Sequence, residues 1–162
     1  MMYSMRKGNI KIALGLGLLL LIILGSFAYY EYSLLQQMDV QLTKTTVKDL
    51  SFSGATLGLT LAITNPSLIT LTVNKLHLEL YSKDIHIADI NSDETLVLAS
   101  EQTVTPEFSL QVRFKDLGQS IVSAFMSGSL EWQIKGLADI ALPLGFTYQY
   151  PFEIENPPAT SA

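Results

Sequence analysis

The chain has 162 residues, 48% of them apolar, and a formal net charge of −5, a size that fits one folded domain rather than two. It contains no cysteine, which excludes disulfides, thiolate metal sites and cysteine nucleophiles. From Glu31 onward it carries seven basic and fifteen acidic side chains, a net of −8, and an acidic domain does not attract nucleic acid.

The N-terminal segment has the length and composition of a transmembrane helix. Ile12 to Tyr30 is an uncharged run of 19 residues, ten of them Leu or Ile. As a helix it spans about 28 Å, close to the roughly 30 Å hydrocarbon core of a lipid bilayer. Arg6, Lys7 and Lys11 precede the run, and basic residues favour the cytoplasmic side. We therefore predict a signal anchor at 12–30 in the cytoplasmic membrane, a basic cytoplasmic N-terminus at 1–11, and a C-terminal domain outside the cytoplasm.

Two other interpretations of this segment are open. Ser26-Phe27-Ala28 offers a cleavage site of the kind found in secretory signal peptides, and a mature chain beginning at Tyr29 would identify that case. Arg6-Lys7-Gly8 also fits a prepilin leader, although Lys11 would then lie in a buried assembly helix. We favour the uncleaved anchor because the apolar run is long and aromatic residues follow it at once.

From Gln41 onward the hydrophobic period is two, which indicates β-strands. The clearest strand covers Thr56–Thr64 and ends at Asn65-Pro66, because proline has no amide hydrogen to donate. We expect the Asn65 side chain to bond neighbouring backbone groups and set the turn. Replacing it by alanine should then cost about 1 kcal/mol. The side chains of this strand predicted to face the core are Leu57, Leu59, Leu61 and Ile63.

The next stretch predicts a hairpin. A strand at Leu71–Tyr81 is followed by a two-residue turn at Ser82-Lys83 and a return strand at Asp84–Ile90. The same period predicts that Ile85 and Ile87 point inward.

This hairpin register places Glu79 opposite His86 on the solvated face, with His77 nearby. His and carboxylate side chains are metal ligands, but three of them on an open sheet face without supporting partners would bind weakly. We therefore predict an exposed polar ladder and no metal or other cofactor.

Beyond the hairpin, Val104–Phe114 predicts a further strand, with Pro106 confined to its start. The period then changes to four, which predicts one short helix at 117–126, with Asp116 as a candidate N-cap and Gly128 as the stop.

Strand periodicity returns at Leu130–Ile134 and again at Ile140–Leu144. An aromatic stripe follows, formed by Phe146, Tyr148, Tyr150 and Phe152 on one face of a last strand. We interpret the stripe mainly as core. The alternative is a surface for an apolar ligand or a protein partner, since exposed apolar stripes mark interaction sites. Residues 155–162 show no periodicity and predict a flexible tail.

Together these patterns predict a mainly β domain at 39–154, joined to the helix by a linker at 31–38. About seven short strands and one helix in this length favour an antiparallel β-sandwich of immunoglobulin-like or fibronectin III-like type.

The domain resembles the late-embryogenesis-abundant type 2 family, also called the water stress and hypersensitive response (WHy) domain. The resemblance is carried by the strand Leu57–Ile63, the Asn65-Pro66 pair after it, the strand end at Leu78–Tyr81 and the return through Ile87-Ala88. It extends over about 39–154. Two departures are Ser67, where the family often has asparagine or another polar residue after the proline, and the absence of glycine at the expected hairpin turn.

The resemblance implies a fibronectin-like sandwich with a helix, a link to desiccation and other stress, an N-terminal membrane helix in many members, and no catalytic residues. The sequence itself has no Gly-x-Ser-x-Gly elbow, and we expect no enzyme activity. Our first hypothesis is a membrane-anchored, stress-related protective or binding module. The alternatives are an accessory or adaptor subunit of a membrane complex and a carrier of an apolar ligand.

Overall fold

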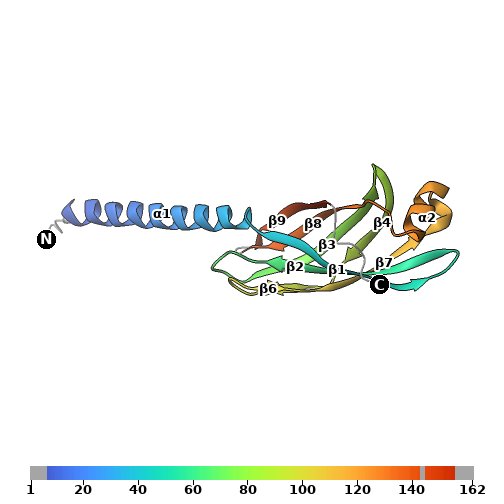
Figure 1. Cartoon of the computed structure of the whole chain (residues 1–162). Helices are drawn as coiled ribbons and strands as arrows, with labels where there is room; N and C mark the ends of the chain where they lie inside the picture. The colour runs from blue at the N-terminus through green and yellow to red at the C-terminus, as the bar shows by residue number, and fades with distance from the viewer. Residues whose placement is uncertain (1–6, 143–144, 156–162) are drawn as a thin grey trace. The chain divides into compact units, whose positions relative to one another are not determined.

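The computed structural model of the chain describes residues 7–142 and 145–155. It divides into a helical unit that ends at Gln37 and a β unit that begins at Met38 (Figure 1). Arg6 and the expected tail from residue 156 onward lie outside the described residues.

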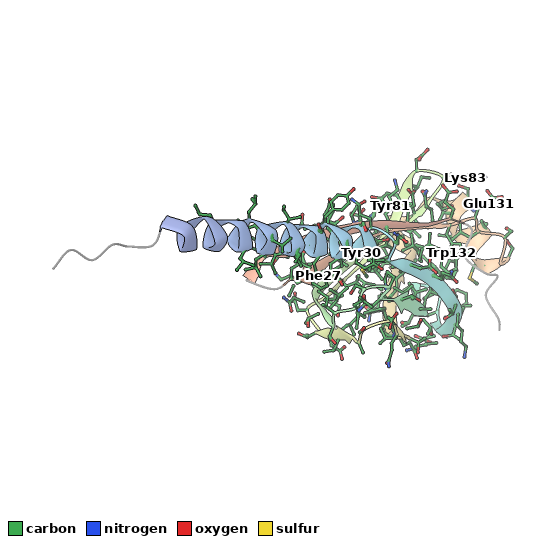
Figure 2. All side chains as sticks on the ribbon, turned by 90° about the vertical axis from the view of Figure 1, so that its left-hand side faces the viewer. Phe27, Tyr30, Tyr81, Lys83, Glu131 and Trp132 are labelled. Carbon is green, nitrogen blue, oxygen red and sulfur yellow. The ribbon has the colours of Figure 1, made fainter. Side chains whose placement is uncertain are left out.

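The helical unit consists of α1, Lys7–Leu35. The helix continues five residues beyond Tyr30, so much of the stretch 31–38 that the sequence predicted as a linker is helical. Its segment Leu14–Leu35 is long and apolar enough to cross a membrane, with a mean hydropathy of 1.8. Its Leu and Ile side chains at 14–24 are all more than half exposed, as are Phe27 and Tyr30, labelled in Figure 2. A helix that is apolar on every side is typical of a membrane span.

The β unit contains two antiparallel sheets, which lie as two layers in Figure 1. In the first sheet, β1 and β7 pair with opposite sides of β2, and short β6 also pairs with β2. Its strands are β1 (Asp39–Leu50), β2 (Gly54–Thr64), β6 (Thr103–Val104) and β7 (Glu107–Arg113).

The second sheet has the order β4-β3-β8-β9, and the short β5 pairs with β3. β9 therefore forms one edge of this sheet, where Pro151 lies exposed midway along the strand, opposite Leu137 of β8. The strands are β3 (Leu71–Ser82), β4 (Ile85–Ser92), β5 (Leu96–Leu98), β8 (Gln133–Ala141) and β9 (Thr147–Glu155).

The core lies between the sheets and is built from the alternating apolar positions of their strands. Of the side chains predicted to face inward from β2, none is more than 3% exposed. The alternation on β3 and β7 is confirmed in the same way, because the side chains that face the core there are buried; these are Leu76, Leu78, Leu80, Phe108, Leu110 and Val112. The prediction of a mainly β domain with antiparallel sheets is confirmed.

The β3–β4 hairpin turns one residue later than the sequence predicted. Lys83 and Asp84 form the turn, with φ values of 47° and 66°, whereas Ser82-Lys83 was expected. Both residues adopt the left-handed conformation that two-residue hairpin turns require. The shift leaves Ile85 at the start of β4 and 47% exposed, contrary to expectation, while Ile87 is buried as predicted.

The register of this hairpin also differs from the prediction. The pairing between β3 and β4 is irregular at Leu80/Tyr81, as it is when a β-bulge adds one residue to one strand. Glu79 therefore lies opposite Asp89, and His86 lies opposite Tyr81. The expected pairing of Glu79 with His86 is wrong.

The helix of the β unit is shorter than predicted. α2 covers Gln119–Met126 rather than 117–126. Asp116 is not its N-cap, because it lies in the short 3-10 helix η1 (Phe114–Asp116) and Gly118 precedes α2. Gly128 follows the helix with a φ of 69°, which agrees with its predicted role as the stop.

The two strands expected at 130–134 and 140–144 are one strand in the structure. β8 runs from Gln133 to Ala141, after Trp132, and Leu144 lies outside the described residues. This continuity was not predicted because Gly136 interrupts the apolar alternation. That glycine pairs with Phe152 of β9, whose ring atoms would lie within 2.5 Å of an added Cβ.

Candidate functional site

Asn65 is the most completely bonded polar side chain of the β unit. It is fully buried at the end of β2. Its amide nitrogen lies within hydrogen-bond distance of three carbonyl oxygens, those of Ile69 at 2.9 Å, Leu98 at 3.0 Å and Ala99 at 3.1 Å, which share its two hydrogens. Its side-chain oxygen accepts from the backbone amide of Ser67 at 3.0 Å and from its hydroxyl at 2.8 Å.

These bonds join two loops that are far apart in the sequence, the one after β2 and the one after β5. Pro66 follows Asn65 without an amide to satisfy, and the buried Ser67 hydroxyl also donates to the Ile69 carbonyl at 3.0 Å. The Asn65-Pro66 pair therefore fixes the loop structurally, as the sequence predicted. All polar atoms of the Asn65 side chain are occupied within the protein, so it offers nothing to a substrate.

The aromatic stripe lies on one face of β9 but is not fully buried. Tyr148, Tyr150 and Phe152 are half-buried, and Phe146 lies before the strand and is 66% exposed. Tyr148, Tyr150 and Phe152 pair with the buried residues Ile140, Ala138 and Gly136 of β8 and so border the core, whereas Phe146 departs from the interpretation of the stripe as core. An edge strand has a neighbour on one side only, so its side chains are less fully covered than those of β3 or β8.

Tyr150 ties the stripe to the start of the β unit. Its hydroxyl donates to the Met38 carbonyl at 2.6 Å, and its ring stacks with that of Phe152 at 6.3 Å between centroids. Burial raises the pKa of the Tyr150 hydroxyl above its ordinary value, and Asp39 adds to this effect. The stripe thus has a structural role at Tyr150 and leaves exposed apolar surface at Phe146.

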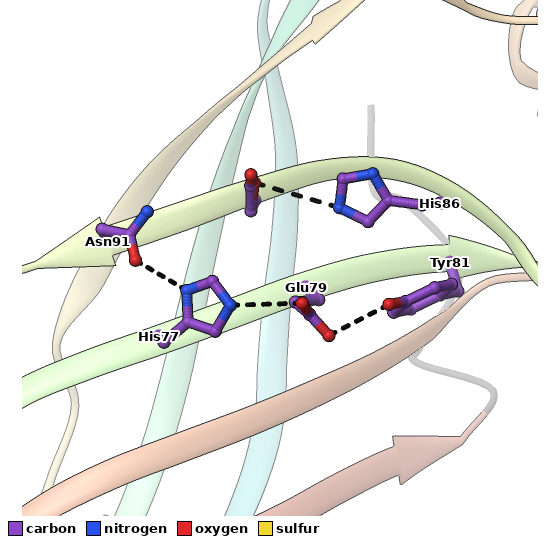
Figure 3. A network of polar contacts seen from close by, with 6 residues as sticks. His77, Glu79, Tyr81, His86 and Asn91 are labelled. Carbon is purple, nitrogen blue, oxygen red and sulfur yellow. Dashed lines mark hydrogen bonds and ion pairs between the residues drawn. The ribbon is translucent and has the colours of Figure 1, made fainter.

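A polar network covers the outer face of the β3–β4 hairpin (Figure 3). His77 Nδ1 lies 2.7 Å from Asn91 Oδ1, and His77 Nε2 lies 3.3 Å from Glu79 Oε1. The Tyr81 hydroxyl donates to the other Glu79 oxygen at 3.0 Å. His86 packs edge-on against the Tyr81 ring, 5.4 Å between centroids. The sequence predicted that His77, Glu79 and His86 lie on one exposed face, but it did not predict that Tyr81 and Asn91 join them.

The network shifts the proton affinities of its members. The hydrogen bond with Glu79 raises the pKa of His77 above its ordinary value, and the one with Asn91 adds to it. Conversely, the bonds from His77 and Tyr81 lower the pKa of the Glu79 carboxyl. The His77 and Glu79 side chains are 39% and 36% exposed, so solvent screens their interaction. Among the described residues there is no group of three potential metal ligands.

We expect this pair to contribute less than about 0.5 kcal/mol to stability, and mainly between pH 4.5 and 6.5. The raised pKa of His77 stabilises the folded state below pH 6.5, and this contribution is lost as the pH rises through the folded-state pKa of His77. The lowered pKa of Glu79 stabilises the folded state above pH 4.5, and this contribution is lost as the pH falls through the folded-state pKa of Glu79. In an NMR titration, Glu79→Gln should lower the pKa of His77. An unchanged His77 titration in that variant would refute the pairing.

The structure also shows a surface that the sequence patterns did not reveal, which we call the tip hollow. It has a volume of about 580 Å³ and lies between the β1–β2 hairpin, η1 and α2. Phe52 at the hairpin tip is fully exposed. The lining residues are Phe52, Ser53, Arg113, Phe114, Lys115, Leu117, Gln119 and Val122. The only hint in the sequence was an aromatic residue in a Ser- and Gly-rich turn.

Comparison with known proteins gives a family match. A family model described as late embryogenesis abundant protein matches residues 60–156, more than half of the chain. The match spans the part of the β unit from the middle of β2 to the end of β9. No curated protein matches the sequence significantly.

Solved structures share the fold at low identity. A solution structure of an Arabidopsis thaliana protein is 16% identical, with a TM-score of 0.52 over 74% of this chain and 82% of that one. A crystal structure described as the ApaA protein of Bordetella pertussis is 14% identical, with a TM-score of 0.50 over 76% and 95%. A solution structure described as a late embryogenesis abundant protein is 14% identical, with a TM-score of 0.48 over 91% and 88%. At these identities the first two likenesses show a shared fold and nothing beyond it.

Proposed function

The chain belongs to the late embryogenesis abundant protein family, and on that premise we propose that it is a membrane-anchored, non-enzymatic β-sandwich protein that binds or protects other components under stress such as desiccation. The family match over residues 60–156 is the observation that carries the stress-related part of this proposal. The exposed apolar helix α1 supports the anchoring part.

Within the family, we propose that the β unit is a WHy domain with a fibronectin III-like sandwich. Seven of its strands have seven or more residues, and they divide into β1-β2-β7 and β4-β3-β8-β9. A sandwich of three and four antiparallel strands supports this type. The Asn65-Pro66 pair at the end of β2 supports the WHy assignment through the resemblance described above.

We propose that α1 is not cleaved from the chain and that it holds the β unit on the extracytoplasmic side of the cytoplasmic membrane. The basic residues before the apolar run favour a cytoplasmic N-terminus. Determining the N-terminal residue of the purified protein distinguishes this anchor from a cleaved signal sequence. A chain that starts at Tyr29 would leave the β unit without its attachment.

Two charges in the middle of α1 should release the chain from the membrane. Each central Leu or Ile contributes about −0.3 to −0.6 kcal/mol to insertion, and each central arginine costs about 2.5–3.5 kcal/mol. The pair Leu20→Arg and Ile22→Arg therefore reverses the sign for the segment. We expect the variant in the supernatant after carbonate extraction, and the matched control with alanine at both positions in the pellet. Retention of the arginine variant in the pellet would contradict a spanning helix.

The protective role is tested with a client protein. The full chain in phosphatidylcholine nanodiscs is mixed with a heat-labile enzyme, heated or dried and rehydrated, and the light scattering of client aggregates is recorded. We expect less scattering than with empty nanodiscs at an equimolar ratio of chain to client. Equal scattering in the two samples would refute protection.

The stripe residues Phe146, Tyr148, Tyr150 and Phe152 are our second candidate surface, for a protein partner or an apolar ligand.

A further inference from the structure

Backbone hydrogen bonds fix the segments that border the tip hollow. The amide of Phe114 donates to the carbonyl of Ser53 at 3.0 Å, which joins the hairpin tip to η1. Within the tip, the amide of Ser51 donates to the carbonyl of Gly54 at 2.9 Å. On the other wall, the Phe114 ring meets that of Phe125 of α2 at 5.5 Å between centroids. The backbone around the hollow and the Phe114 wall are therefore in place without a ligand, as is usual for ligand sites.

The lining of the tip hollow combines apolar surface with positive charge. Phe52, Phe114, Leu117 and Val122 supply the apolar part, and Arg113 and Lys115 supply two cations. The described β unit from Met38 to Glu155 has only seven basic residues against fourteen acidic ones. Two of the seven basic residues thus meet at one apolar hollow, while the rest of the unit repels anions.

The two cations differ in how far they are already neutralised. Arg113 Nε lies 3.4 Å from Asp116 Oδ2, and both side chains are more than half exposed. For Lys115, the described part of the chain shows neither an ion pair nor a side-chain hydrogen bond. A ligand anion at the hollow therefore meets the ammonium group of Lys115 directly. For the guanidinium of Arg113 it competes with Asp116.

We propose that the tip hollow binds a single-chain amphiphile with an anionic head, of the fatty-acid type. The hydrocarbon chain lies against Phe52 and Val122, and the carboxylate receives charge-assisted hydrogen bonds from Arg113 and Lys115. A volume of about 580 Å³ falls within the range of about 300–1,000 Å³ for small-molecule sites. This site is additional to the proposed protective function and does not depend on it.

The test is photo-crosslinking on the full chain in phosphatidylcholine nanodiscs. The probe is a diazirine-bearing long-chain fatty acid, and the control is the corresponding alcohol, which has the same chain without the charge. We expect saturable labelling of the peptides that contain Phe52 and residues 113–122, displaced by excess palmitate. The alcohol should label these peptides about tenfold less, because it lacks the charge-assisted bonds.

Matched variants make the test specific. Replacing Arg113 and Lys115 together by glutamine should reduce labelling by the acid about tenfold or more. Asp116→Asn should increase it, because it frees the Arg113 guanidinium. Val122→Trp should block the hollow, and Lys83→Gln at the other hairpin should change nothing. Trp132 fluorescence melting confirms that each variant is folded.

The outcomes decide the proposal even if Val122→Trp does not fold. Equal labelling by acid and alcohol would overturn it, as would labelling confined to α1 or spread over the β unit. Undiminished labelling after loss of both cations would also overturn it. Failure of the client assay would leave this result unaffected, since the two experiments measure different properties.

Discussion

Replacing Asn65 by alanine lowers the free energy of unfolding of the β unit by about 3–4 kcal/mol, because the Ser67 amide loses its side-chain partner and three carbonyl groups each lose one hydrogen bond in a dry environment. The Ile69 and Ala99 carbonyls each keep one partner, the Ser67 hydroxyl and the Gln102 amide. Each buried polar group left unpaired costs about 1–3 kcal/mol. The sequence alone suggested about 1 kcal/mol, the value of a single bond. The structure raises this expectation, because the side chain makes five bonds at zero exposure.

The measurement is thermal unfolding of the full chain in detergent, followed by the fluorescence of Trp132, the single tryptophan. For a unit of this size the melting temperature should fall by roughly 10–15 °C. Asn74→Ala is the matched control, because Asn74 is exposed on β3 and its loss should change little. Equal melting of the Asn65 variant and this control would show that the loop does not depend on the amide.

Replacing Gly54 by alanine should cost about 2–3 kcal/mol, which is within the range for forcing extra volume into a packed site. An added Cβ would lie 2.2 Å from the backbone oxygen of Val112 on β7. That oxygen belongs to the strand and cannot rotate away, so β2 and β7 must separate locally. The change should also disturb the tip hollow, because Gly54 follows Ser53 in its wall.

Gly58→Ala in the same strand is the control. Its Cβ would meet Thr46 Oγ1 at 2.6 Å and Lys48 Cε at 2.8 Å. Both atoms belong to side chains on β1 that are able to rotate, so we expect a cost below about 1 kcal/mol. Urea unfolding of both variants gives the comparison. A cost at Gly54 no greater than that at Gly58 would contradict the close approach of β2 and β7.

The sequence predicted most of the fold because alternation of apolar and polar residues is a local signal. Leu57 to Ile63 shows it fully, and those side chains are buried as expected. The β3–β4 register was missed because its turn at Lys83-Asp84 has none of the glycine or asparagine that usually marks a left-handed turn. The irregular pairing at Leu80/Tyr81 leaves no mark in the apolar pattern.

The candidate sites were harder to predict because they depend on contacts between distant segments. Asn65 was identified from the proline beside it, but its partners Leu98 and Ala99 lie 33 and 34 residues further along. The tip hollow unites Phe52 with η1 and α2 only through the pairing of β2 with β7. Nothing in the periodicity of either segment indicates that they meet.

Pro151, exposed midway along β9, bears on how the molecule behaves when solvent is withdrawn. An open strand edge is a template on which a second copy can add and start aggregation. A proline there has no hydrogen to give to an incoming strand, and Glu153 and Glu155 add like charges that repel an identical neighbour. Anchored molecules crowd together in two dimensions as their surroundings dry. For the anchored, stress-related protein proposed above, we expect this edge of β9 to let neighbouring molecules approach one another and still separate on rewetting.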